Sequence, residues 1–328
     1  MKPLGVSSIT VVVCTYNRCQ TLARALASIA ASRMPSSVEW DVLVVDNNSS
    51  DGTREVVEHY RRQYPGRFGY LMERQQGLSR ARNAGVRGSA GDIIVFTDDD
   101  VTVDPEWLRN LTKDLGMGEW AGSAGRIVPV LESPLPKWLA PDQANISGPF
   151  VALDLGPVPA PMTQAPFGAN MAFQKAVFHK YGEFRTDLGR SGDGLLSCED
   201  SEFGQRLLAA GERLRYEPSA VVNHPVPGDR LHKGYLLSWF FGKGQSDVRA
   251  VRISAPTGWT VAGIPPILFR RIVRWTAQWL VSVRPSERFG CRLNMWYIAG
   301  AISAYYQRSH VQSNESASSF SAVKRSGS

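Results

Sequence analysis

Three consecutive carboxylates, Asp98, Asp99 and Asp100, are the residues of this 328-residue chain with the clearest capacity for chemistry. They directly follow the apolar run from Ile93 to Phe96, which predicts a buried strand. Two carboxylate charges ~4 Å apart repel each other by roughly 4 kcal/mol at an effective dielectric of about 20. A surface turn would spread these charges into water, whereas a cluster held at the end of a core strand requires a cation. The three residues by themselves leave both interpretations open.

Two further polar clusters are expected at the same edge of the fold. Apolar runs predict buried strands over residues 9–13, 42–45 and 93–96, and amphipathic helical spacing lies between them. This alternation predicts an α/β fold with a mostly parallel sheet flanked by helices. Ligands bind such sheets beyond the carboxyl ends of the strands. The residues that follow the three predicted strands are 14–18, 46–48 and 98–100, so their convergence favours a ligand site.

The common phosphate-binding loops are absent from the sequence. It contains no GxxxxGK(S/T) motif, and no glycine follows the first predicted strand, which excludes a P-loop and a dinucleotide fingerprint. A nucleotide-binding domain of this kind has to neutralise a diphosphate by another route. Carboxylates that hold a divalent metal between protein and phosphate are such a route.

The second half of the chain contains segments of different composition. Nine of the 20 prolines lie within residues 129–166, which predicts an irregular excursion. A helix is then expected from near Asp200 to Gly211, followed by a strand at 219–226. Beyond these, the sequence predicts Trp- and Arg-rich helices and a Ser-rich disordered end. We therefore expect a domain at 1–228 (halves about 1–128 and 129–228), a helical C-terminal extension at 229–308 and a disordered tail at 309–328.

Six motifs in order resemble family 2 glycosyltransferases over roughly residues 8–226: VVVCTYNR, VLVVDNNSSDGT, GLSRARNAGV, DIIVFTDDDV, GANMAF and CEDSEF. The resemblance implies the nucleotide-diphospho-sugar transferase fold called GT-A. It also implies an inverting transfer of a sugar from a nucleotide-diphosphate donor, with a UDP-sugar preferred. The acceptor would be a hydroxyl of a glycan or a lipid-linked molecule in polysaccharide or glycolipid synthesis.

The resemblance also assigns a donor site. Asp46 would accept a hydrogen bond from the base, whereas a capped turn, the alternative for this segment, explains Asp51 but gives Asp46 no purpose. Arg82 would face the phosphates; otherwise it is an exposed helix arginine. The other residues expected to bind the nucleotide-sugar are Thr15, Tyr16, Asn17, Arg18, Asn48, Asp98 and Asp99.

The same resemblance implies that the three carboxylates bind a cation and are not a solvated surface turn. Asp100 would coordinate Mn²⁺ or Mg²⁺ that bridges the two phosphates, while Asp98 and Asp99 would hold the ribose side and the waters of the metal. Asp98 and His224 complete the expected metal site, although a lone histidine is more often structural.

The pair Glu199 and Asp200 in CEDSEF is expected to act on the acceptor. In the family pattern the aspartate is the general base, which makes Asp200 the catalytic residue and Glu199 an acceptor-binding helper. The alternative is that Asp200 only favours the start of a helix through the helix dipole.

Two other classes remain open. A sugar nucleotidyltransferase would share the α/β core but would carry a Gly-rich phosphate loop. A catalytically inactive glycan-binding or nucleic-acid-binding protein would suit a basic C-terminus, but it has no use for Asp98, Asp100 and Asp200 together. We therefore expect no nucleic acid partner.

Charge predicts the location of the protein. Residues 229–328 carry 14 Lys and Arg against four Asp and Glu, a net charge of +10, whereas the first 228 residues carry −3. No apolar stretch reaches the ~20 residues that cross a bilayer, and the first apolar run is too short for a signal peptide. Residues 258–283 combine tryptophans with a basic face, as in helices that lie on anionic membranes. We expect a cytoplasmic enzyme bound peripherally to the inner face of the membrane; packing onto the catalytic domain is the alternative.

Overall fold

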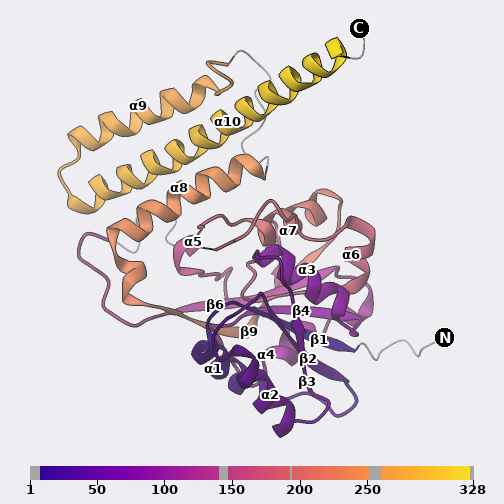
Figure 1. Cartoon of the computed structure of the whole chain (residues 1–328). Coiled ribbons are helices and arrows are strands. Elements are labelled where there is room, and N and C mark those ends of the chain that lie inside the picture. Colours follow the sequence, from indigo (N-terminus) through magenta and orange to yellow (C-terminus); the bar gives the residue numbers. More distant parts are fainter. Residues whose placement is uncertain (1–7, 140–146, 193, 251–259, 326–328) are drawn as a thin grey trace. The chain divides into compact units, whose positions relative to one another are not determined.

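The computed structural model describes residues 8–139, 147–192, 194–250 and 260–325 (Figure 1). The chain forms two compact units. One unit comprises residues 1–134, 145–193 and 199–230, and the other comprises residues 135–144, 194–198 and 231–328. We call them the α/β unit and the helical unit.

A nine-stranded sheet forms the centre of the α/β unit, with the order β3-β2-β1-β4-β8-β6-β9-β5 and with β7 paired to β9. The first four strands in this order are parallel, and β8 runs antiparallel to both of its neighbours. The mostly parallel sheet is therefore confirmed. The strands are β1 (Ile9–Thr15), β2 (Trp40–Asp46), β3 (Phe68–Met72), β4 (Ile93–Asp98), β5 (Thr102–Val103), β6 (Gly122–Leu131), β7 (Ala160–Pro161), β8 (Met171–Gln174) and β9 (Leu214–Val226).

Helices cover both faces of this sheet, with α1 and α2 on one side and α3, α6 and α7 on the other (Figure 1). The core strands are buried on both faces, since Val11, Val12 and Val13 are all fully buried. This explains why their sequence is continuously apolar. The helices are α1 (Cys19–Ala30), α2 (Thr53–Gln63), α3 (Leu78–Gly88), α4 (Trp107–Thr112), α5 (Ser147–Phe150), α6 (Lys175–Tyr181) and α7 (Glu199–Ala209), with 3₁₀ turns η1 (Leu115–Met117) and η2 (Gly228–Leu231).

Two features of the α/β unit differ from the sequence expectation. Strand β3 was not predicted, because it is a short edge strand that contains a glycine and lacks a continuous apolar run. The proline-rich segment is also less irregular than expected. Strand β6 passes through Pro129 to Leu131, and the short elements α5 and β7 follow within the described residues.

Three helices, α8 (Lys233–Arg249), α9 (Pro266–Val281) and α10 (Pro285–Arg325), form the helical unit, as the sequence predicts for a helical C-terminal extension. Helix α10 packs against both α8 and α9. Val248, Leu268, Ile298 and Ala301 belong to their shared hydrophobic core. No described helix has the length and apolar content needed to cross a bilayer.

The sequence predicts a disordered tail from residue 309, whereas the structure continues α10 to Arg325. Disorder of the tail stays a prediction. Residues 326–328 lie outside the described part of the chain. The segment has many serines but no proline, and its first glycine is Gly327. Nothing in it therefore stops a helix that is already formed over residues 285–308, since extending a helix is easier than nucleating one.

Two glycines allow α8 and α10 to approach each other closely. A Cβ atom on Gly244 of α8 would overlap the carbonyl oxygen of Tyr297, and one on Gly300 of α10 would overlap the carbonyl oxygen of Phe241. The clash is with backbone in both cases, so a side-chain rotation cannot relieve it. The packing of these two helices therefore depends on both glycines.

We predict that Gly300→Ala lowers the free energy of unfolding by about 1–3 kcal/mol, because the added methyl group forces the two helices apart. The matched control is Gly290→Ala in the same helix, where an added Cβ meets no atom within 4 Å. That variant should be neutral or up to ~1 kcal/mol more stable, because alanine favours the helix. Urea unfolding followed by circular dichroism measures both, and equal stability of the two variants would contradict the prediction.

Candidate active site

The strand register brings the three polar clusters to one edge of the sheet. Thr15 at the end of β1 pairs with Asp46 at the end of β2, and Cys14 pairs with Asp98 at the end of β4. The carboxyl ends of the three parallel strands therefore meet as the sequence predicts. This edge is the candidate active site.

The turns that follow β1 and β2 are fastened to each other. Asn17 and Asn48 both adopt positive φ angles, 51° and 68°, as turn residues. The Asn17 Oδ1 accepts a hydrogen bond from the Ser50 backbone N–H at 2.8 Å. Asp51 accepts hydrogen bonds from the N–H groups of Cys19 at 2.9 Å and Thr53 at 3.1 Å, so one carboxylate serves the starts of both α1 and α2. This gives Asn17 and Asp51 clear structural roles.

Asp46 has structural partners that the sequence did not reveal. It is buried, and it accepts hydrogen bonds from the Ser49 N–H and the Tyr70 hydroxyl, both at 2.8 Å. Burial, together with the hydrogen bond to Asp46, raises the pKa of Tyr70 to about 12. Contact with a nucleotide base stays a prediction for Asp46. Among the other expected donor residues, Asn48 is exposed and the Tyr16 side chain is 42% exposed.

Asp99 points into the protein and is tied to the turn after β1. It accepts a hydrogen bond from the Thr15 hydroxyl at 2.7 Å, and the Arg18 Nη1 lies 3.2 Å from its other oxygen. Burial, with the charge of Asp100 beside it, raises the pKa of Asp99 to about 7. Asp99 thus differs in environment from the two carboxylates that flank it in the sequence.

Asp98, Asp100 and His224 come together as a candidate metal site. One potential ligand atom from each lies within 4.8 Å of the others. The Asp100 Oδ1 and the His224 Nδ1 are buried, and within the described part of the chain they have no hydrogen-bond partner. Burial lowers the pKa of His224, which favours the neutral imidazole that binds metals. Oxygen and imidazole ligands with unused lone pairs suit a divalent cation.

Three arginines lie against these carboxylates. Arg18 Nη1 is 3.0 Å and Arg230 Nη2 is 3.6 Å from the same oxygen of Asp100. Arg82 Nη2 is 3.6 Å from Asp98. Arg82 is 4% exposed, so its alternative interpretation as an exposed helix arginine is wrong. Arg230 was not predicted, because a single arginine in an irregular segment carries no recognisable pattern.

Glu199 is a buried partner of Arg82. The Arg82 Nη1 donates a hydrogen bond to Glu199 at 2.5 Å. Burial and the neighbouring Asp200 raise the pKa of Glu199 to about 7, although Arg82 opposes this rise. Arg82 therefore connects Asp98 on one side with Glu199 on the other. The expected contact of Glu199 with the acceptor stays a prediction.

Asp200 lies in the first turn of α7 with both of its oxygens hydrogen-bonded. It accepts hydrogen bonds from the backbone N–H groups of Gly168 at 2.7 Å and Ser201 at 2.5 Å. The bond from Ser201 lies within the first turn of α7, whereas the bond from Gly168 ties Asp200 to another segment, and together they fix the direction of the carboxylate. A Cβ on Gly168 would overlap the Arg82 guanidinium, so a larger residue there would have to displace this buried side chain. Gly168 is the first residue of the motif GANMAF, through which the sequence indicates this position.

Comparison with known proteins agrees with this geometry. Residues 10–180 match Glycosyl transferase family 2. The chain is 30% identical over 241 residues to the Succinoglycan biosynthesis protein ExoM of Rhizobium meliloti (strain 1021), an alignment that covers 72% of this chain and 73% of the relative. The chain belongs to glycosyl transferase family 2.

This family 2 glycosyltransferase also resembles proteins from other organisms. It is 26% identical over 255 residues to the Glucosyl-dolichyl phosphate glucuronosyltransferase of Haloferax volcanii, covering 73% of this chain and 75% of that protein. Its fold is similar to the mannosyltransferase PcManGT of Pyrobaculum calidifontis, solved with GDP-Man and Mn²⁺. The TM-score is 0.57 at 22% identity, and the match covers 92% of this chain and 75% of that one. The fold is thus of the GT-A type, as the sequence predicts.

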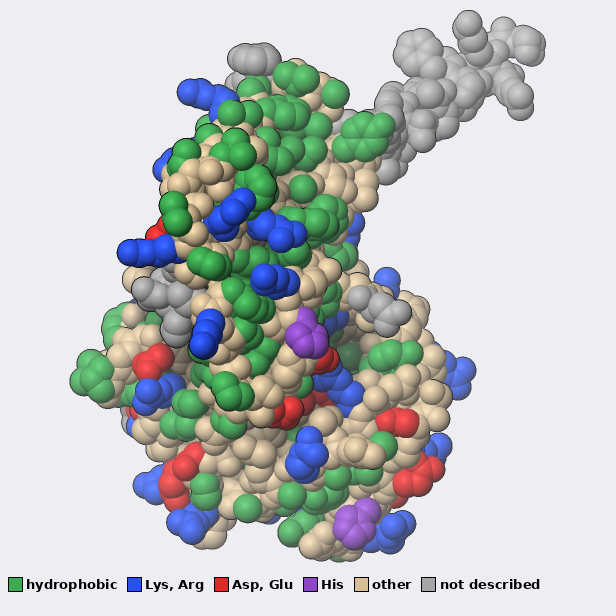
Figure 2. Space-filling view, turned by 90° about the vertical axis from the view of Figure 1, so that its left-hand side faces the viewer, with side chains coloured by type: hydrophobic (Ala, Val, Ile, Leu, Met, Phe, Trp, Pro, Cys, Tyr) green, Lys and Arg blue, Asp and Glu red, His purple; other side chains and the backbone are tan. Residues whose placement is uncertain are grey.

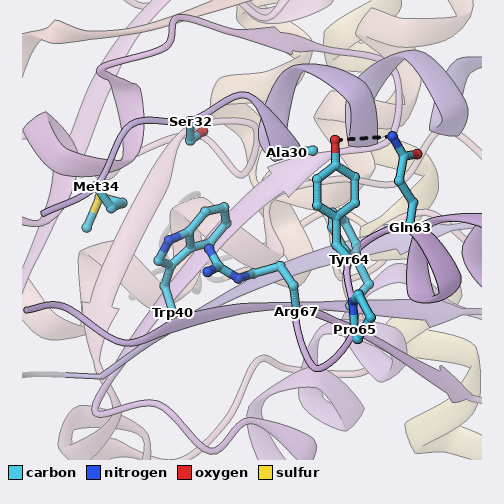
Figure 3. Close-up of a pocket in the computed structure, with 9 residues that line it drawn as sticks. Ala30, Ser32, Met34, Trp40, Gln63, Tyr64, Pro65 and Arg67 are labelled. Atoms are coloured by element: carbon cyan, nitrogen blue, oxygen red, sulfur yellow. Dashed lines mark hydrogen bonds between the residues drawn. The ribbon is translucent and has the colours of Figure 1, made fainter. Parts of the chain in front are cut away.

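Figure 3 shows a cavity of about 500 Å³ in this glycosyltransferase, lined by residues other than those of the candidate active site. Its lining includes Trp40 at the start of β2, whereas Asp46 ends the same strand at the opposite edge. The Arg67 guanidinium lies 4.0 Å from the centre of the Trp40 ring and occupies part of this region. None of the expected site residues lines the cavity, so the carboxylates and the histidine define the candidate site.

We predict that Asp100→Ala weakens Mn²⁺ binding by at least ~10-fold, because even residues behind the metal ligands typically contribute that much. Titration of Mn²⁺ followed by electron paramagnetic resonance measures the free ion directly. Asp104→Asn is the control, since Asp104 is exposed and lies outside the three-residue cluster. If Asp100→Ala binds Mn²⁺ as tightly as the control, the metal site is wrong.

Proposed function

We propose that this glycosyltransferase transfers a sugar with inversion from a nucleotide-diphosphate donor, a UDP-sugar being the preferred donor, to an acceptor hydroxyl in glycan synthesis. The observation that carries this proposal is the cluster of Asp98, Asp100 and His224 at the sheet edge, with Arg82 linking it to the Glu199–Asp200 pair. Arg82 thereby links the candidate metal site to Glu199, the residue that precedes the candidate base Asp200.

In this proposal, Asp98, Asp100 and His224 hold a divalent cation, with Mn²⁺ preferred. The bound ion would supply positive charge that stabilises the departing diphosphate. Asp98 is kept in place by Arg82, and Asp99 is fixed to the turn after β1 by Thr15. The activation of the acceptor hydroxyl is carried out by a side chain of the protein.

Asp200 acts as the general base in the proposed mechanism. It takes the proton from the acceptor hydroxyl as that oxygen bonds to the anomeric carbon. The bond from this carbon to the phosphate oxygen breaks on the opposite face, and the nucleoside diphosphate leaves with the electron pair. An oriented base contributes ~10²–10⁴-fold to the rate. The two backbone hydrogen bonds to Asp200 support this role, because they orient its carboxylate.

We predict that a panel of nucleotide sugars contains a donor whose nucleoside diphosphate is released only with Mn²⁺ present, and that excess chelator abolishes the release. Asp200→Asn should reduce transfer by ~10²-fold or more while donor binding is retained, since the lost group acts only in the chemical step. Coupled detection of the released diphosphate measures transfer, and calorimetry measures donor binding.

The control for this experiment is Asp92→Asn, an exposed aspartate at the other end of β4. It should transfer sugar as the unaltered protein does. Near-normal transfer by Asp200→Asn would remove Asp200 from the mechanism, and full activity in chelator would remove the metal.

We also propose that the protein works at an anionic membrane surface, which a lipid-linked acceptor would explain. Helix α9 exposes Val273 and Leu280, at 67% and 68%, together with Phe269 at 37%. Spacings of four and seven residues put these three on one side of the helix. Arg270 and Arg274 are exposed beside them. Hydrophobic and basic side chains lie side by side over the helical unit in the upper part of Figure 2.

The chemistry of this surface fits an anionic lipid headgroup region. An amphipathic helix of this type buries its apolar side at the acyl boundary, and each basic residue near the surface adds ~1 kcal/mol. Leu268 is buried in the core of the helical unit, and Ile272 and Trp275 pack against that core. Phe269, Val273 and Leu280 lie outside it and are exposed, so this side of α9 can contact lipid. The inner face of the cell membrane is the proposed location.

We predict that the protein floats with vesicles containing anionic lipid at low salt, but not with neutral vesicles, and that high salt releases it. Arg270→Glu with Arg274→Glu should abolish flotation. The control is Arg61→Glu with Arg62→Glu in α2, which changes the net charge equally. The proposal would be contradicted if both double variants floated equally, or if only detergent released the protein from the vesicles. Self-association through α9, detected by light scattering, would also contradict it.

A further inference from the structure

Arg230 is a buried cation that no predicted role explains. It lies in the 3₁₀ turn η2 that directly follows β9. Its side chain is 10% exposed, and its Nη2 is 3.6 Å from the Asp100 Oδ2. Within the described residues its Nη1 is buried and has no hydrogen-bond partner. A buried guanidinium nitrogen without an acceptor is unusual, because buried polar groups are nearly always hydrogen-bonded.

Asp100 does not satisfy this arginine. A separation of 3.6 Å is an ion pair but too long for a hydrogen bond. The same carboxylate oxygen is already 3.0 Å from Arg18 Nη1, which donates a hydrogen bond to it. Two guanidinium groups therefore share one oxygen, and Arg230 retains unused donors. A guanidinium presents several N–H donors in a plane, a geometry that matches the oxygens of a phosphate group.

The neighbouring candidate metal site makes an anion the natural partner. A divalent cation held by Asp98 and Asp100 would compete with Arg18 and Arg230 for the charge of Asp100. The positive charges of both arginines would then lie next to the cation, and Asp100 alone would no longer neutralise them. The proposed donor brings a diphosphate, which carries that charge, to the same place.

We infer that Arg230 binds the diphosphate of the donor, and that Arg18 and Arg230 contact it from two sides of Asp100. This inference rests on the proposed function and names a residue for its donor site. Arg18 comes from the turn after β1 and Arg230 from the segment after β9, so the two residues reach Asp100 from separate parts of the α/β unit. Arg230 should therefore distinguish a nucleoside diphosphate from a monophosphate.

The test uses the full chain with Mn²⁺ and four probes, UDP, UMP, GDP and GMP, because the base is not identified. Arg230→Gln should weaken binding of the diphosphate by ~10- to 100-fold, the loss expected for charge-assisted hydrogen bonds, while monophosphate binding changes by less than ~3-fold. Arg230→Lys should recover part of the loss, because it keeps the charge without the planar fork. Calorimetry measures each dissociation constant.

Mn²⁺ binding without nucleotide, measured by electron paramagnetic resonance, separates this role from a structural one. The control is Arg213→Gln, an exposed arginine paired with Glu119. An unchanged preference for diphosphate over monophosphate in Arg230→Gln would overturn the inference. An equal loss of Mn²⁺ binding would also overturn it, because Arg230 would then only hold Asp100. If the unaltered protein binds neither diphosphate, the proposed function itself fails, and this inference fails with it.

Discussion

Negative charge at the carboxyl edge of the sheet is the constraint on which the rest of the site depends. Asp98 ends strand β4 and Asp99 and Asp100 follow it, and the burial of Asp99 makes the repulsion between these carboxylates stronger than it would be in water. The protein responds by surrounding them with Arg18, Arg82 and Arg230, each from a different segment. The positions of α1, α3 and η2 relative to the sheet are therefore coupled to the charge of the site.

The three carboxylates are not equivalent, and this division gives the site its chemistry. Asp99 turns inward to Thr15, where burial raises its pKa to about 7. Asp98 and Asp100 instead lie near His224, with lone pairs left over on Asp100 and the imidazole. Asp99 thus anchors the turn, whereas Asp100 keeps one carboxylate oxygen without a hydrogen-bond partner. A run of three identical residues acquires separate environments because successive side chains at a strand end point in different directions.

The sequence predicts the parts of this site that depend on local pattern. Buried apolar runs locate β1, β2 and β4, and the parallel register then brings Thr15, Asp46 and Asp98 together. Other parts depend on contacts between distant segments. His224, which only the family resemblance indicates, reaches the site through the pairing of β9 with β6. Tyr70, which the sequence does not indicate, reaches Asp46 from an edge strand without an apolar run. The serine-rich composition of residues 309–325 predicts disorder, whereas the structure continues α10 to Arg325 through a segment that contains no proline or glycine.

The double contact of Arg82 links several positions of this chain, so that they cannot change independently. Its guanidinium touches Asp98 and Glu199 at once, and Gly168 leaves room for it only by having no side chain. Residues 82, 98, 168 and 199 therefore act as one unit, since a change in one leaves the buried Arg82 charge without a partner or places a side chain against its guanidinium. New donor or acceptor preferences would have to arise around this unit. A laboratory library aimed at altered sugar specificity should keep these four positions fixed and vary the exposed turn residues such as Tyr16 and Asn48.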